Sequence, residues 1–254
     1  MDLLQEIAHC PIVEYCKAHP DSGHPCAAIV AVQDSVPLAD HQAPEPWSGH
    51  LEEAPILFLG SNPSITYEEE NPVGSWSNLH IADFFSNQFS GGREEWIRDG
   101  RYSRSKDGIH FKYVPFWSGV RERAAELMEV DVNDLLSGID YCISQAVHCK
   151  SRDQIGVAAA FEPCVGRYLE RLVAQSGAKV IVCLGVHAAR AAKQTFNVPT
   201  VEKIFGPVEV GQRERMFTFL PHPAARSLPK SFAKNLLEDE LGRLRAFLRH
   251  DGSE

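Results

Sequence analysis

The sequence lacks the features of a membrane, secreted or fibrous protein. None of its apolar runs approaches the roughly 18–20 residues that a membrane span needs. The first six residues, MDLLQE, are acidic and are not followed by the apolar core of a signal peptide. Internal repeats and low-complexity tails are absent as well. We therefore expect a cytoplasmic globular protein of ordinary composition.

Positive charge is also scarce. The 254 residues include 25 Lys and Arg against 34 Asp and Glu, which gives a net charge of −9. This balance argues against a protein that coats nucleic acid, but a cleft can still be locally basic because its field depends on nearby charges. Within 93–112, six basic residues, Arg98, Arg101 and Arg104 among them, face four acidic ones. This stretch is either a solvated excursion or a loop that contacts phosphates.

Seven cysteines are present, and a reducing compartment disfavours a disulfide framework for them. Buried thiols or metal ligands remain as the two interpretations. Cys142 and Cys183 lie within apolar runs and are expected in the core.

Apolar runs that alternate with helical patterns predict a parallel sheet covered by helices. Strands are expected at 56–59, 141–147, 179–184 and 216–220, and helices at 3–16, 78–89, 116–128, 161–176, 188–195 and 232–248. The resulting fold class is a three-layer α/β/α domain with a central, mainly parallel four-stranded sheet. It spans residues 1–254, with an irregular segment at about 17–53 and a polar loop insertion at about 90–112.

Two of the expected strands end in rigid polar turns. The first runs into Gly60-Ser61-Asn62-Pro63-Ser64, where Pro63 restricts the backbone of Asn62. The second runs into Pro221-His222-Pro223. Ligands in open α/β sheets bind beyond the carboxyl ends of the strands, so an amide and an imidazole are expected at a site there. An ordinary turn at Asn62, and a capping or core role for His222, remain the alternatives.

Four ordered stretches together resemble the uracil-DNA glycosylase superfamily. Leu59-Gly-Ser-Asn-Pro-Ser64 resembles its first motif in the Gly-x-Asn-Pro form, and Leu220-Pro-His-Pro-Ala-Ala-Arg226 its second catalytic motif. Gln145-Ala-Val-His-Cys149, and Phe161 to Leu169 with the strand that follows, are similar to stretches of the iron–sulfur branch. Residues 67–139 are not placed by the resemblance.

The resemblance implies a monofunctional DNA repair enzyme that hydrolyses the N-glycosidic bond of uracil, with other deaminated bases left open, to leave an abasic site. Asn62 and His222 would be catalytic: Asn62 positions water or the base, and His222 donates a hydrogen bond to the leaving uracil. An amide is not a strong base, so the chemistry would depend on stabilising the departing base.

The resemblance also suggests how the partner, uracil-containing DNA in single- or double-stranded form, is bound by a monomer. Gln145 replaces the family's specificity asparagine with a side chain one methylene longer, and Phe116 is the nominated stacking ring, although it or Trp117 could belong to the core. The remaining contacts to the base would come from the first motif, at Gly60, Ser61, Pro63 and Ser64. Contacts to the DNA backbone would come from the second motif, at Arg226, Ser227 and Lys230.

A [4Fe–4S] cluster is implied by the same branch, because Cys149 and Cys164 have the spacing of two of its ligands. Cys10 and Cys16 would supply the other pair, with Cys26 as the open alternative. The family's N-terminal Cys-x-x-Cys is not present. Reduced buried thiols remain the other interpretation.

Two further functions stay open at this stage. One is a protein that binds uracil-containing DNA without turnover, or traps it covalently through a histidine in a basic loop. The run of Arg and Lys before a His that such a branch carries is not found, and Arg104-Ser-Lys-Asp-Gly-Ile-His110 is only distantly similar to it. The other is hydrolysis of a small nucleoside or nucleotide, which the acidic composition fits better.

Overall fold

The computed structural model describes residues 2–66, 68–89, 92, 94–199, 202–225 and 227–250. Across these ranges, none of the helices has the length and apolar character that crossing a membrane requires. Arg226, which the sequence assigns to DNA contact, lies outside the described residues.

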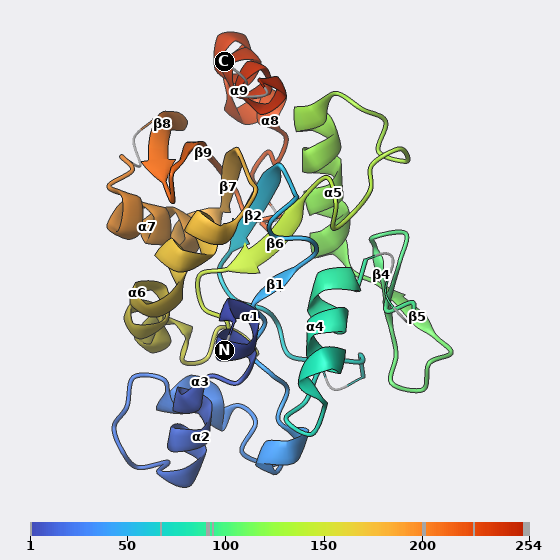
Figure 1. Cartoon of the computed structure of the whole chain (residues 1–254), viewed down its shortest axis with the longest axis vertical. Helices are drawn as coiled ribbons and strands as arrows, with labels where there is room; N and C mark the ends of the chain where they lie inside the picture. The colour runs from blue at the N-terminus through green and yellow to red at the C-terminus, as the bar shows by residue number, and fades with distance from the viewer. Residues whose placement is uncertain are drawn as a thin grey trace.

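A six-stranded sheet forms the centre of the molecule, in the order β1-β6-β2-β7-β9-β8 (Figure 1). Its four inner strands are parallel and match the four that the sequence predicts. They are β2 (Ile56–Gly60), β6 (Cys142–Gln145), β7 (Val180–Leu184) and β9 (Arg213–Leu220). Leu57 pairs with Cys142 on one side and with Ile181 on the other. This register brings the carboxyl ends of the strands to one edge of the sheet.

The sheet has six strands rather than the predicted four, because an antiparallel strand lies at each edge. They are β1 (Trp47–Ser48), which pairs with β6, and β8 (Ile204–Val210), which pairs with β9. A two-residue strand carries no readable pattern. In β8, Gly206 and Pro207 interrupt the apolar alternation at a bulge, and proline is tolerated there because the strand lies at an edge.

Helices cover the sheet on two sides, and Figure 1 shows α6 and α7 to the left of it with α4 and α5 to the right. Ser77 begins α4 by accepting a hydrogen bond from the backbone N–H of His80, and Pro115 begins α5 without losing a helical hydrogen bond. The elements are α4 (Asn78–Asn87), α5 (Pro115–Met128), α6 (Val157–Gln175) and α7 (Gly185–Phe196).

Both terminal helices expected from the sequence are divided in two. At the N-terminus the break falls before Pro11, which cannot continue a helix hydrogen-bonding ladder and instead starts a new helix. At the C-terminus, Leu236 and Leu237 adopt an extended backbone between the two segments. The four helices are α1 (Leu3–Ala8), α2 (Pro11–Ala18), α8 (Phe232–Asn235) and α9 (Glu238–Arg249).

Regular structure also occurs within the two segments that the sequence marks as irregular. The first, about 17–53, holds α3 (Ala27–Ala31), the 3-10 helix η1 (Leu38–Asp40) and β1. The polar insertion at about 90–112 contributes to a separate antiparallel sheet rather than forming a loop throughout. Its strands are β3 (Ile97–Arg98), β4 (Tyr102–Arg104) and β5 (Phe111–Tyr113).

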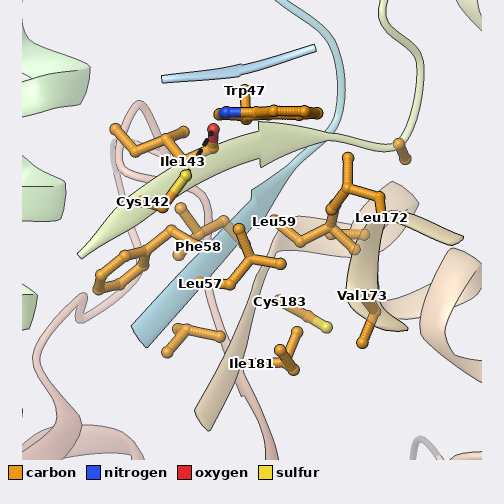
Figure 2. Packing of buried hydrophobic residues seen from close by; sticks show 14 of the residues in the cluster. Trp47, Leu57, Phe58, Leu59, Cys142, Ile143, Leu172, Val173, Ile181 and Cys183 are labelled. Carbon is orange, nitrogen blue, oxygen red and sulfur yellow. Dashed lines mark hydrogen bonds between the residues drawn. The ribbon is translucent and has the colours of Figure 1, made fainter. Parts of the chain in front are cut away.

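The core lies between the inner strands and the helices. Side chains from β2, β6 and β7 meet those of α6 there (Figure 2). Cys142 and Cys183 are both fully buried in this layer, which confirms their predicted place in the core. Burial raises the pKa of both thiols, so they remain protonated structural side chains. The rigid layer fixes the strand ends from which the candidate site is built.

Candidate active site

A cavity of about 300 Å³ opens at the carboxyl edge of the sheet. Asn62, Phe116, Gln145 and His222 all line it, as do Pro63 and Ser64. These residues come from the ends of β2, β6 and β9 and from the start of α5. The structure therefore brings together both residues predicted to be catalytic and four of those predicted to bind the base.

Asn62 is held by the turn in which it lies. Its Oδ1 accepts a hydrogen bond from Ser61 Oγ at 3.2 Å, and its Nδ2 donates to the backbone oxygen of Pro63 at 3.0 Å. The amide is thus oriented by its two neighbours in sequence. It offers dipoles to a ligand, but no group that accepts a proton readily at neutral pH.

Gln145 lies across the end of β2, and Gly60 makes room for it. A Cβ at position 60 would come within 2.2 Å of Gln145 Oε1. Gln145 is 4% exposed, and its Oε1 finds no hydrogen-bond partner in the described part of the chain. An unsatisfied buried acceptor in a cavity wall is suited to an N–H donor on a ligand.

His222 has one defined tautomer. The backbone N–H of Ala224 donates to its Nδ1 at 3.2 Å, so in the neutral ring the proton is carried by Nε2. Burial, together with the positive charge of Lys230, lowers the pKa of His222 and favours that neutral form. The imidazole can therefore donate a hydrogen bond from Nε2 without carrying a charge.

The position of the His222 ring is set by its packing. Its ring stacks on that of Phe116 with centroids 5.3 Å apart. On another side, Gly185 adopts a φ of +82°, and a Cβ there would approach the His222 Cβ to 3.2 Å. Phe116 accordingly stacks on the candidate catalytic histidine while it lines the cavity.

A comparison with models of protein families shows the family to which the chain belongs. A model described as the Uracil DNA glycosylase superfamily matches residues 46–241, more than three quarters of the chain. The protein belongs to this superfamily. Comparison with curated proteins gives no match. Enzymes of the uracil-DNA glycosylase superfamily generally hydrolyse N-glycosidic bonds in DNA, and both rigid turns lie inside the matched region.

Residues predicted to contact the DNA backbone differ in how the structure places them. Ser227 is exposed and Lys230 half-buried, both after the second glycosylase motif. Lys230 is close enough for its charge to act on His222. Neither residue is part of the cavity wall.

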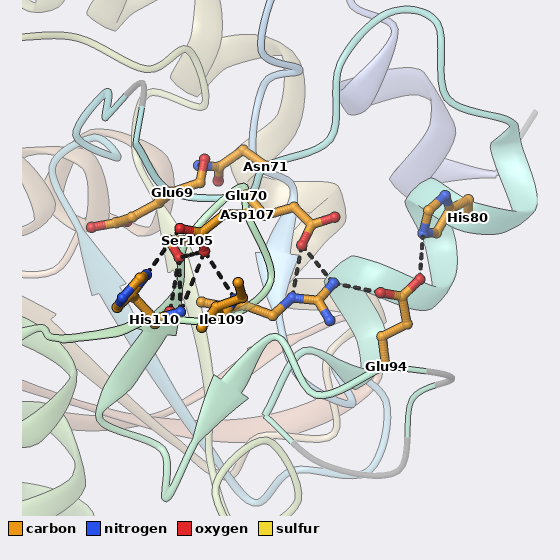
Figure 3. Close-up of polar contacts among 10 residues, drawn as sticks. Glu69, Glu70, Asn71, His80, Glu94, Ser105, Asp107, Ile109 and His110 are labelled. Atoms are coloured by element: carbon orange, nitrogen blue, oxygen red, sulfur yellow. Dashed lines mark hydrogen bonds and ion pairs between the residues drawn. The ribbon is translucent and has the colours of Figure 1, made fainter.

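Two arginines of the insertion, Arg98 and Arg104, are already engaged with the protein itself. Arg104 donates from Nε to Glu70 Oε2 at 2.8 Å and also pairs with Glu94, so its charge is compensated twice (Figure 3). Arg98 pairs with Glu95 and stacks over the ring of Phe111 at 3.7 Å. These contacts hold the insertion together, and Arg104 is not a free phosphate ligand.

The insertion reaches the cavity through other residues that the sequence did not single out. Trp96, Ile97 and Ser103 line it, and the Trp96 ring lies 5.1 Å from that of Phe84. Trp96 is 2% exposed and its Nε1 finds no acceptor among the described residues. The sequence signal for Trp96 is that a large aromatic side chain occurs in an otherwise polar insertion.

Two further wall residues, Glu45 and Lys150, form a buried ion pair with 3.3 Å between Oε2 and Nζ. They are 105 residues apart in the chain. Lys150 directly follows the Gln145–Cys149 stretch, which could have drawn attention to it. Glu45 lies in the segment that the sequence predicts to be irregular, and no motif there indicates a functional role for it.

A second, apolar cavity is lined by four cysteines, Cys10, Cys26, Cys149 and Cys164. Cys16 is buried nearby on α2 but is not part of this wall. Burial raises the pKa of Cys26 and of Cys164 to about 12 in each case. Two of these sulfurs accept hydrogen bonds at 3.4 Å: Cys10 from the hydroxyl of Tyr168 and Cys164 from the backbone N–H of His148.

Within the described residues, no three His, Cys, Asp or Glu side chains are gathered closely enough to hold a single metal ion. This absence is compatible with the four-cysteine cavity, because each thiolate of an iron–sulfur cluster binds a different iron. The four sulfurs around a cluster therefore lie further apart than four ligands around one ion. Four thiols on one apolar cavity fit the donor set of a [4Fe–4S] cluster.

Proposed function

We propose that this protein is a monofunctional DNA glycosylase that hydrolyses the N-glycosidic bond of uracil in DNA and leaves an abasic site. The observation that carries the proposal is the hydrogen bond from the Ala224 N–H to His222 Nδ1. It leaves an N–H at Nε2 of a residue in the cavity wall, where the carbonyl oxygen of a flipped base would accept it.

Each remaining wall residue has a role in this proposal. Phe116 supplies an apolar surface beside the base, and Gln145 Oε1 accepts the hydrogen of a base N–H. Asn62, fixed by Ser61 and Pro63, orients the base or the attacking water. The C1′–N bond breaks with its electron pair on the base, and the water oxygen bonds to C1′. Stabilising the negative charge on the base is then the main catalytic task.

The test is release of uracil from a labelled single-stranded oligonucleotide, read by alkaline cleavage at the abasic site. The unaltered protein is expected to release uracil, and Asn62→Ala and His222→Ala are each expected to lower the rate by about 10²–10³-fold, the typical cost of losing one donor to a developing charge. If both variants release uracil at the unaltered rate, the proposed roles of these residues are wrong.

We further propose that Cys10, Cys26, Cys149 and Cys164 hold a [4Fe–4S] cluster, as in the iron–sulfur branch that the sequence resembles. Their shared apolar cavity supports this set, with Cys26 in place of Cys16. A bound cluster supplies a redox-active centre and a covalent cross-link. The link would join the segment between α1 and α3 to α6 and to the segment that follows β6.

A further inference from the structure

The buried ion pair in the wall of the candidate active site raises the question of what stabilises a departing base there. The lowered pKa of His222 favours its neutral form, and Asn62 and Gln145 are uncharged amides. Among the described residues that line this cavity, Lys150 is the one lysine or arginine. Glu70, another wall residue, is compensated by Arg104 (Figure 3).

Lys150 is built into the wall rather than lying on the surface. It is 4% exposed, and its Nζ contacts Glu45 Oε2 at 3.3 Å and Asn71 Oδ1 at 3.0 Å. Asn71 is in turn oriented by a hydrogen bond from its Nδ2 to the backbone oxygen of Glu69 at 3.4 Å. An ammonium has three protons, and these contacts use two of them. The third can be directed at a ligand in the cavity.

The backbone around the pair is equally fixed. The N–H of Glu45 donates to the His148 oxygen at 2.9 Å, and His148 Nδ1 lies 2.7 Å from the Glu45 oxygen. On the other side, Ser151 donates from its backbone N–H to the Pro63 oxygen at 3.0 Å. Backbone hydrogen bonds on both sides of Lys150 therefore fix its position, between the segment that contains Glu45 and the turn that contains Asn62.

We infer that the ammonium of Lys150 donates a hydrogen bond to a carbonyl oxygen of the flipped base and stabilises the negative charge that develops on the base as the glycosidic bond breaks. This inference rests on the proposed function. A charge placed in a water-poor wall and held by fixed partners acts strongly, because neither solvent nor side chain must reorganise as the base departs. Lys150 is thus a catalytic residue, and Glu45 and Asn71 are positioning residues.

Atoms and electrons balance in this step without a further reactant. Both electrons of the C1′–N bond leave with the base nitrogen, which becomes an anion held by Lys150 and by Nε2–H of His222. The water oxygen bonds to C1′ and loses one proton to solvent. That proton, or another from solvent, neutralises the base after release, so no oxidant or further reactant is needed.

The experiment compares two variants that differ in the cation alone. Lys150→Met by itself would leave the partly buried Glu45 carboxylate without its cation, with Ser48 Oγ as its remaining hydrogen-bond donor, and would destabilise the fold. The pair compared is therefore Glu45→Gln, which keeps the ammonium, and the double variant Glu45→Gln with Lys150→Met, which leaves neither charge alone. Lys17→Met serves as the matched control. Lys17 Nζ also makes two partly buried hydrogen bonds, to the backbone oxygens of Gln33 and Val36, but it lies outside the cavity wall.

Single-turnover release is measured for uracil and for 5-fluorouracil in the same oligonucleotide. Fluorine withdraws electron density, so the 5-fluorouracil anion needs less help from the protein. Relative to Glu45→Gln, the double variant is expected to lose on the order of a hundredfold on uracil. Its loss on 5-fluorouracil should be several-fold smaller. Lys17→Met should change neither rate by more than about twofold.

Equal losses on the two bases, or no loss on either, would overturn the role of Lys150 while leaving the proposed function intact, provided that the unaltered protein releases uracil. Release of neither base by the unaltered protein would overturn the proposed function and this inference together. The ratio of the two losses is a quantity that a purely structural lysine would not change.

Discussion

The backbone nitrogen of Ala224 and Nδ1 of His222 lie 3.2 Å apart, and this one contact fixes Nε2 as the nitrogen that carries the proton in the neutral ring. The turn Pro221-His222-Pro223 makes the contact possible, because two prolines restrict the backbone on either side of the histidine. A neutral imidazole oriented in this way can stabilise a departing base without first being protonated.

The pH dependence of uracil release follows from that contact. Below its pKa the ring carries a proton on Nδ1 and can no longer accept the Ala224 hydrogen bond. Because burial and Lys230 lower the pKa of His222 in the free protein, the acid limb of kcat/KM against pH should lie below 6.5. Lys230→Gln removes the nearby positive charge and should move the limb to higher pH, whereas Lys234→Gln should not move it. A limb unchanged in Lys230→Gln would contradict this account.

Gly60→Ala should lower activity through the side chain of Gln145. The added Cβ would lie 2.2 Å from Gln145 Oε1 and would displace the amide from the end of β2. We expect a loss of roughly tenfold or more in kcat/KM for uracil, by analogy with the cost of losing one base-reading contact of 1–3 kcal/mol. Gly242→Ala is the matched control, since its Cβ would meet nothing within 4 Å. Equal activity of the two variants would show that Gln145 does not read the base.

Cysteine substitution separates the proposed cluster ligands from a bystander. Cys26→Ala should lose iron, sulfide and visible absorbance, because Cys26 lines the shared cavity. Cys16→Ala should retain all three, since Cys16 is buried outside that wall. The reverse result would restore Cys16 as the ligand, and absence of iron from the unaltered, anaerobically purified protein would contradict the cluster itself.

Tyr168 gives the same proposal a second readout. Its hydroxyl donates to Cys10 Sγ at 3.4 Å, and hydrogen bonds to ligating sulfurs are one of the factors that set a cluster's potential. Tyr168→Phe should keep the cluster and lower its reduction potential, measured by voltammetry. An unchanged potential would show that this hydrogen bond does not reach a cluster ligand.

Much of the fold could be predicted because it depends on local pattern. The inner strands β2 and β7 are short apolar runs such as Ile56–Leu59, and continuous burial on both faces requires such runs. The missed edge strand β8 shows the limit, since Gly206 and Pro207 remove the alternation that identifies a strand. Pro11 divides the predicted first helix, because a proline is favoured at the start of a helix and cannot continue one.

The site was predictable to the extent that its residues sit in sequence motifs. Asn62 and His222 follow strands that the sequence reveals, and the register of a parallel sheet then brings them to one edge. The pairing of Glu45 with Lys150 is different, because it joins positions 105 residues apart through packing alone. The ion pairs of Arg104 are a second example, since tertiary structure brings Glu70 and Glu94 to its guanidinium.

Acid stability should depend on His41. This imidazole is 4% exposed, and burial and the charge of Lys17 lower its pKa to about 4, with Asp34 acting in the opposite direction. Unfolding restores a pKa near 6.5, so the unfolded chain binds more protons between these values and stability falls as pH drops from about 6.5 to about 4. The loss should be about 3 kcal/mol for this group. Burial lowers the pKa of His148 to about 4 as well, so His41→Gln should reduce the slope of that part of a denaturation series without abolishing it. An unchanged slope would contradict the assignment.

The central claim is turnover on uracil in DNA, and counting product per protein molecule tests it most directly. A known amount of unaltered protein is mixed with a large excess of uracil-containing single-stranded oligonucleotide, and free uracil is measured over time. The account predicts many molecules of free uracil for each protein molecule, with no adduct that survives SDS. Release of one molecule or fewer, together with an SDS-resistant protein–DNA band, would contradict it and would show that the protein traps its DNA instead of turning over.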